Sequence, residues 1–180
     1  MRFILAFACT LTLFAAACSQ SSEEQSGDLG ETEIAIVREP VQTETAKLTP
    51  DGLSILAEGS DRPAIVTFGT SRGETERILT GGLGSPISEN QPNDCGLTST
   101  HYEGLALHFR DDLFVGYFAN APYVPEKTKA EMLDDPDVTL LADSTIDGEF
   151  TMGPQGDAIS GIFVGDEVRG MWAGENCIAR

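Results

Sequence analysis

The stretch LHFRDDLFVGYFA, residues 107–119, decides the fold, because a related stretch, GIFVGDEVRGMWA, follows 54 positions later at residues 161–173. In each stretch, two apolar runs flank a pair of residues that suits a tight turn, Asp111-Asp112 in the first and Gly165-Asp166 in the second. Alternating apolar residues on both sides of a two-residue loop are typical of a β-hairpin. The sequence therefore predicts two related antiparallel hairpins.

The similarity extends beyond the hairpins at the same offset, which aligns Ile78-Leu79 with Met132-Leu133 in two predicted helices. Two copies of such a unit indicate an internal duplication, although short strands can also match by chance. We expect an α+β fold: a tandem of two helix-plus-antiparallel-hairpin units that form one sheet, with short helices packed on one face. The pseudo-repeats are residues 65–119 and 120–177.

Strict alternation along each strand predicts which residues form the core. In the first hairpin Phe109 then shares the core face with Phe118, and in the second Phe163 shares it with Trp172. The opposite face is the candidate interaction surface. Five of its residues are proposed to meet a partner: His108, Val115, Tyr117, Arg169 and Met171.

The segment FGTSRGETERILTGGLGSP, residues 68–86, is rich in glycine but lacks the Gly-Lys pair that a phosphate-binding P-loop requires. It is better explained as a helix with glycines at its ends. Ser71 and Glu74 have the spacing of a capping box, and Gly81-Gly82 is expected to end the helix. In the second unit Pro125 and Glu126 suit the first turn of a helix.

Within this segment Gly69-Thr70-Ser71-Arg72, Glu74, Leu79 and Leu83-Gly84-Ser85-Pro86 resemble the signature of the SmpA/OmlA outer-membrane lipoproteins. The resemblance covers residues 65–119, and it reaches 120–177 only through the repeat. It implies a helix-plus-antiparallel-sheet architecture, shared with the beta-lactamase inhibitor protein, and a place in the bacterial envelope. This chain departs from the pattern by Thr75, where the family has an aliphatic residue, and by the inserted Thr80-Gly81-Gly82.

The N-terminus has the layout of a secretory signal peptide, with Arg2 before an apolar run, so residues 1–17 are expected to be removed. The sequence Ala15-Ala16-Ala17-Cys18 is similar to a lipobox, which predicts acylation of Cys18 and an anchor in the outer membrane facing the periplasm. The alternative is ordinary cleavage after Ala17, which gives a soluble periplasmic or secreted protein. Residues 18–47 are predicted to be an acidic tether, and 48–180 a single domain that begins with strands at 53–56 and 64–68.

Three cysteines remain after the signal peptide, and acylation of Cys18 leaves Cys95 and Cys177 as a pair. In an oxidising compartment this pair predicts a disulfide. Two free thiols or a metal pair are the alternatives.

The chain has 29 acidic against 11 basic residues and a net charge of −18, which disfavours nucleic-acid binding. His101 and His108 are expected on opposite faces of one strand, which disfavours a two-histidine metal site, and no catalytic or cofactor motif is found. We therefore expect a non-enzymatic interaction module with an envelope protein as partner and the membrane contacted only through its lipid. The alternative is a small-molecule binder or hydrolytic enzyme with an acidic cleft that uses His101 with Asp94 or Glu103.

Overall fold

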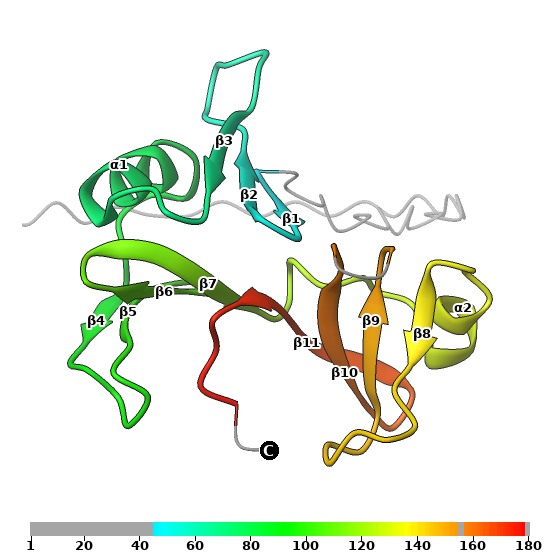
Figure 1. The fold of residues 1–180 in the computed structure, drawn as a ribbon. Helices are drawn as coiled ribbons and strands as arrows, with labels where there is room; N and C mark the ends of the chain where they lie inside the picture. Colours follow the sequence, from blue (N-terminus) through cyan, green and yellow to red (C-terminus); the bar gives the residue numbers. More distant parts are fainter. Residues whose placement is uncertain (1–44, 155–156, 179–180) are drawn as a thin grey trace, which may run out of the picture. The chain divides into compact units, whose positions relative to one another are not determined.

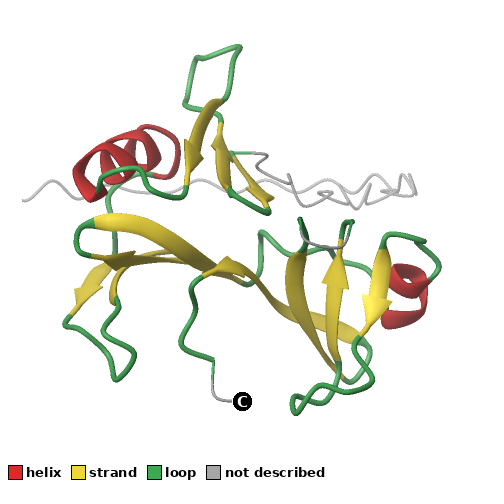
Figure 2. Cartoon of the chain, in the orientation of Figure 1, coloured by secondary structure: helices red, strands yellow, loops and turns green. Residues whose placement is uncertain are grey.

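The computed structural model describes residues 45–154 and 157–178, which form a mixed α+β domain made mostly of strands in two antiparallel sheets (Figures 1 and 2). The smaller sheet has the order β1-β2-β3, with β1 at Ala46–Thr49, β2 at Gly52–Ile55 and β3 at Ala64–Thr67. The prediction of one sheet was wrong, because the chain forms two, and β1 begins two residues before the predicted domain start at Leu48. No helix among the described residues has the length and apolar character needed to cross a bilayer.

The larger sheet has eight strands in the order β4-β5-β6-β7-β11-β10-β9-β8. Helix α1 (Arg72–Leu83) precedes the first four of them in the chain, and α2 (Lys129–Leu133) precedes the last four. The strand order of the second half is therefore the mirror of the first, with β7 and β11 paired at the centre. The strands are β4 (Ser88–Asn90), β5 (Thr98–Tyr102), β6 (Leu105–Arg110), β7 (Leu113–Ala119), β8 (Val138–Leu140), β9 (Glu149–Met152), β10 (Ile159–Val164) and β11 (Glu167–Gly174).

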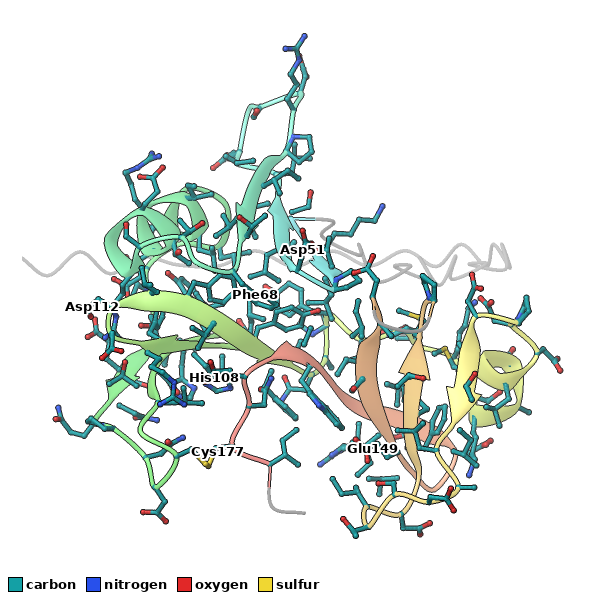
Figure 3. All side chains as sticks on the ribbon, in the orientation of Figure 1. Asp51, Phe68, His108, Asp112, Glu149 and Cys177 are labelled. Carbon is teal, nitrogen blue, oxygen red and sulfur yellow. A yellow bond between two sulfur atoms is a disulfide. The ribbon has the colours of Figure 1, made fainter. Side chains whose placement is uncertain are left out.

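Two apolar clusters cover one face of the larger sheet. Leu79 of α1 packs in a cluster with residues of β2, β6 and β7, and Met132 of α2 packs in a second cluster with residues of β9, β10 and β11. Figure 3 shows Phe68, which packs against the first cluster, and His108 on opposite sides of the β6–β7 ribbon. We call the side that carries His108, turned away from both clusters, the far face.

A β-bulge in each hairpin overturns part of the predicted alternation. In the first hairpin Phe109 pairs with Phe114 but His108 pairs with Gly116, so Val115 is an extra residue. In the second hairpin the same shift leaves Arg169 unpaired. Because an extra residue reverses the sides of all that follow, Tyr117 and Met171 lie in the core, where their side chains are 0% and 1% exposed. Their assignment to the interaction face was wrong.

The helix ends also differ from the prediction. The side chain of Ser71 makes no capping hydrogen bond, and Glu74 instead forms an ion pair with Arg77, 2.7 Å between Oε1 and Nη2. The capping box lies at the start of α2, between Thr128 and Glu131. Helix α2 therefore begins at Lys129, later than Pro125 and Glu126 indicated.

Gly81 and Gly82 lie inside α1, which continues to Leu83 and ends at Gly84 with φ of 80°. A Cβ built on Gly82 lies 2.7 Å from Cγ2 of Ile55 in β2, whereas one on Gly81 meets only Cβ of Ala57 at 3.9 Å. Gly82 thus permits close contact between α1 and β2 and does not end the helix, as the sequence analysis expected.

Both helices meet their hairpins through the same contacts. The main-chain N–H of Arg72 donates to the carbonyl of Asp112 at 2.7 Å, and that of Lys129 donates to the carbonyl of Asp166 at 2.9 Å. The guanidinium of Arg72 lies 4.7 Å from the ring centroid of Phe109, and Nζ of Lys129 lies 5.6 Å from that of Phe163. Each helix start is thereby fixed to a hairpin loop by a hydrogen bond and a cation–π contact.

Candidate interaction face

One row of residues crosses the far face and takes one residue from each of the eight strands. The row is defined by the strand register, and none of its members is Asp, Glu, Lys or Arg. We call it the cross-sheet row; in order from β4 to β8 it consists of Ser88, His101, Ala106, Phe118, Trp172, Ser160, Thr151 and Thr139.

Two aromatic rings form the centre of the cross-sheet row. Phe118 and Trp172 are directly paired on β7 and β11, and their rings are stacked with centroids 6.2 Å apart and planes at 11°. The ring of Phe118 occupies the space above Gly170, since a Cβ on that glycine would lie 2.5 Å from Cζ. Phe118 stays partly exposed, whereas Trp172 is 5% exposed. Both rings were predicted to lie in the core, but the bulges put them on the far face.

Two histidines flank the rings on the β5–β6 side. They lie on adjacent strands and on the same face, not on opposite faces of one strand, because a turn at Glu103-Gly104 separates β5 from β6. Nδ1 of His108 is 2.9 Å from Oγ of Ser99, and Nε2 of His101 is 2.8 Å from Nδ2 of Asn90. These contacts hold both imidazoles within the polar part of the far face.

His108 has an altered proton affinity. Burial lowers the pKa of His108, the neighbouring His101 lowers it further, and a hydrogen bond with Asn176 acts in the opposite direction. Desolvation disfavours the charged imidazolium, so it dominates here. His108 is therefore held in its neutral form over a wider pH range than a free histidine.

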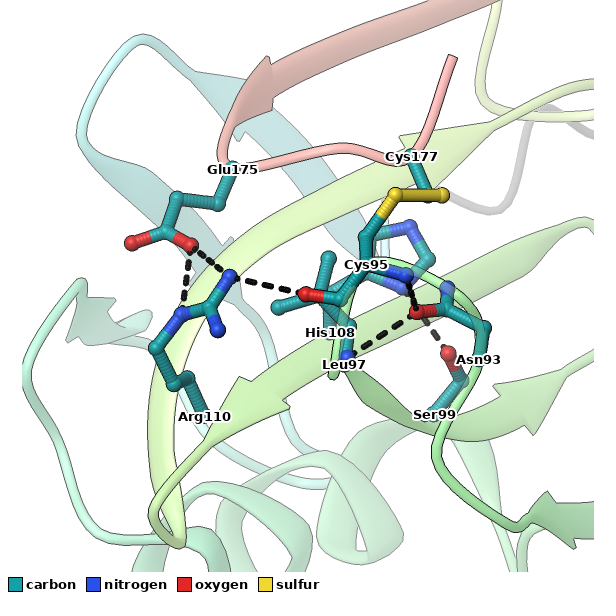
Figure 4. The surroundings of a disulfide bond; sticks show 8 residues. All are labelled: Asn93, Cys95, Leu97, Ser99, His108, Arg110, Glu175 and Cys177. Carbon is teal, nitrogen blue, oxygen red and sulfur yellow. Dashed lines mark hydrogen bonds and ion pairs between the residues drawn. A yellow bond between two sulfur atoms is a disulfide. The ribbon is translucent and has the colours of Figure 1, made fainter. Parts of the chain in front are cut away.

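The segment after β11 is attached to the first half of the sheet (Figure 4). A disulfide joins Cys177 to Cys95, with the Cα atoms 5.8 Å apart, as the sequence analysis predicted. Nη2 of Arg110 lies 2.7 Å from Oε2 of Glu175 and also donates to the carbonyl of Cys95 at 3.2 Å. The segment, Arg110 and Trp172 together line a cavity of about 350 Å³. The C-terminal segment is thus part of this surface.

The other predicted site residues are found in different places. Val115 and Arg169 are the bulge residues, half-buried and exposed respectively. Cys18 lies outside the described residues. Among the described residues, no hydrogen bond or ion pair links His101 to Asp94 or Glu103. The arrangement required by the hydrolytic alternative is therefore not formed in this structure.

The described residues contain no group of three or more His, Cys, Asp or Glu side chains placed to hold a metal ion. Comparison of the chain with protein-family models, curated proteins and solved structures finds no match. The far face offers stacked rings and polar side chains, together with the Arg110–Glu175 ion pair.

Proposed function

We propose that this chain is a non-enzymatic protein-interaction module that binds another protein through its far face. The observation that carries the proposal is the cross-sheet row, which has the stacked rings of Phe118 and Trp172 at its centre. Protein interfaces have aromatic centres depleted of charge and surrounded by polar groups. The row has this composition, with hydroxyl side chains on both sides of the rings and the imidazole of His101 on one side.

The charge of the chain makes this surface distinctive. With 29 acidic residues among 180, an uncharged row across eight strands contrasts with the composition of the chain. Burial of charge without a partner is costly, so a neutral row loses less solvation when it is covered. The far face is thus suited to contact with a protein surface.

We propose that an internal duplication produced the symmetry of this surface. Phe118 and Trp172 are 54 positions apart, as are the bulge residues Val115 and Arg169, and the mirrored strand order pairs the two rings at the centre. The repeated contacts of the two helices with their hairpin loops support the same origin. On these grounds, and because segment 68–86 carries the sequence signature, we infer kinship with the SmpA/OmlA lipoproteins.

We further propose that the domain is carried on the periplasmic side of the outer membrane by an acyl group on Cys18. The support is the sequence Ala15-Ala16-Ala17-Cys18 after an apolar run. Mass spectrometry of the mature N-terminus tests this proposal. A diacylglyceryl adduct on Cys18 is expected, whereas an unmodified cysteine overturns the anchor and favours a soluble periplasmic or secreted protein.

Photo-crosslinking in the native bacterium tests the interaction face. A benzophenone amino acid is placed at Ile162 or Thr151 on the far face, and at Arg77 on the exposed side of α1 as the matched control. We expect a discrete crosslinked partner from the far-face positions only, and loss of that band in Phe118→Ala. No crosslink from either far-face position, or an equal pattern from Arg77, contradicts the proposal.

A further inference from the structure

A second concave surface lies on the opposite side of the larger sheet from the far face. A groove of about 580 Å³ is bounded by β1 on one side and by residues 122–127 on the other. Its lining is mainly apolar and includes Tyr123, Met152 and Met171. Methionine side chains adapt to ligands of different shape, and Pro122 and Pro125 restrict the backbone of the second wall. We call it the β1 groove.

The wall formed by β1 is an edge of the smaller sheet within the described part of the chain. β1 pairs only with β2 among the described residues, and the N–H of Leu56 donates to the carbonyl of Thr45 at 2.9 Å. Hydrogen-bonded pairs alternate along an antiparallel ladder, so the peptide groups of Lys47 also face β2. Those of Ala46 and Leu48 point away from β2, and both residues line the groove.

These outward peptide groups identify the kind of ligand. An acyl chain fills apolar volume but leaves N–H and C=O groups unpaired. An extended peptide forms hydrogen bonds with a strand edge and places alternate side chains into adjoining pockets. The β1 groove combines an edge with an apolar pocket, as strand addition requires.

The charge of the groove indicates which peptide is favoured. The chain contains three lysines, and two of them, Lys47 and Lys127, line the β1 groove together with one acidic residue, Glu126, so that the lining carries a net positive charge. In a chain of net charge −18, most other surfaces repel an acidic segment. An apolar peptide with acidic ends therefore finds complementary charge here.

We propose that the β1 groove binds an extended segment of another protein, apolar with acidic flanks, which adds as a strand to the edge of β1. The apolar side chains of the segment contact Met152 and Tyr123, and its carboxylates lie near Lys47 and Lys127. This site is separate from the far face and does not depend on the function proposed above.

Fluorescence anisotropy with the full mature chain tests the proposal. The probe is a fluorescein-labelled pentapeptide, Glu-Val-Ile-Val-Glu, together with two N-methylated versions, one modified at both valines and the other at the isoleucine. Because alternate N–H groups of an added strand face the edge, we expect one N-methylated version to bind about tenfold more weakly and the other to be little changed. Equal binding of all three overturns strand addition, and no binding at about 1 mM probe overturns the site.

Protein variants locate the binding. Ala46→Pro removes an outward N–H while keeping the β1–β2 ladder, and we expect it to weaken binding about tenfold. Lys127→Glu is expected to weaken binding in a salt-dependent manner, with Arg62→Glu in an exposed loop as the matched charge control. Circular dichroism confirms that each variant is folded.

Two further measurements separate this proposal from its alternatives. Phe118→Ala is expected to leave pentapeptide binding unchanged, so loss of far-face binding and loss of groove binding are distinguishable. A dansyl-labelled fatty acid serves as the competing ligand. If it binds and the pentapeptide does not, the groove is an acyl site and the proposal is wrong.

Discussion

Val115 and Arg169 occupy the same place in the two hairpins: each is the extra residue of a β-bulge, and they are 54 positions apart. The bulges reverse the sides of the residues that follow in β7 and β11. They bury Tyr117 and Met171 and bring Phe118 together with Trp172 on the far face. Two single residues therefore determine which side chains the far face presents.

Deleting Val115 is expected to leave the domain folded with Tyr117 still in the core. Without the extra residue, Phe114, Gly116 and Tyr117 pair regularly with Phe109, His108 and Leu107, so their side chains keep the sides that they have now. We expect a loss of no more than about 3 kcal/mol in the free energy of unfolding, measured by urea denaturation. Val115→Ala keeps the bulge and is the control, with an expected loss of about 1 kcal/mol or less. Unfolding of the deletion variant would contradict the role of Val115 as the residue outside the regular alternation.

Gly81→Ala and Gly82→Ala are expected to change stability in opposite directions. Alanine favours a helix over glycine by about 0.5–1 kcal/mol, and a Cβ on Gly81 makes only an ordinary contact with Ala57. A Cβ on Gly82 overlaps Ile55, which is expected to cost about 1–3 kcal/mol. Thermal unfolding of the two variants checks this pair. Stabilisation by both substitutions would show that α1 and β2 are not in close contact.

The stability of the domain is expected to fall as the pH is lowered through 6.5, the ordinary pKa of histidine. Burial lowers the pKa of His108 in the folded state, so the unfolded chain binds more protons in this range. The contribution of His108 is fully present above pH 6.5 and is lost as the pH falls through its folded-state pKa. Urea unfolding between about pH 7.5 and 5.5 measures the slope, which should be smaller in His108→Gln. An unchanged slope in the variant would assign the pH dependence to other groups.

Replacing Cys95 and Cys177 together by alanine is expected to lower the free energy of unfolding by about 4–5 kcal/mol, because the two cysteines are 82 positions apart. The double variant avoids a free thiol. Equilibrium unfolding without reductant gives the value, with the wild-type chain under reducing conditions as the comparison. A loss below about 1 kcal/mol would indicate that the denatured chain is not restrained by the bond.

Local patterns predicted the two hairpins and their loops, because a two-residue turn depends on adjacent residues. Asp111 and Asp112 both have positive φ, as a primed turn requires. The position of a bulge depends instead on how strands and core pack across the sheet, so alternation alone assigned Tyr117 and Met171 to the wrong face. One signal in the sequence could have indicated the aromatic centre of the far face: residues 118 and 172, at equivalent positions of the two hairpins, are both aromatic.

The helix ends, too, could be predicted only in part, because they depend on residues elsewhere in the chain. Ser71 and Glu74 have the spacing of a capping box, but Arg77 competes for the carboxylate of Glu74 through a bidentate contact. The role of Gly82 depends on Ile55, which lies on a separate strand, and the edge of β1 becomes visible only once the smaller sheet is assembled. Such long-range contacts cannot be derived from spacing in one segment.

The bond between Cys95 and Cys177 has a consequence for proteolysis. All of the chain from β5 to β11, including α2, lies between these two residues and belongs to one covalent ring. A protease that cleaves one loop inside the ring, such as the turn at Asp111-Asp112, opens the ring without releasing a fragment. The two ends stay in register for the sheet, so a nicked molecule can persist in a compartment rich in proteases.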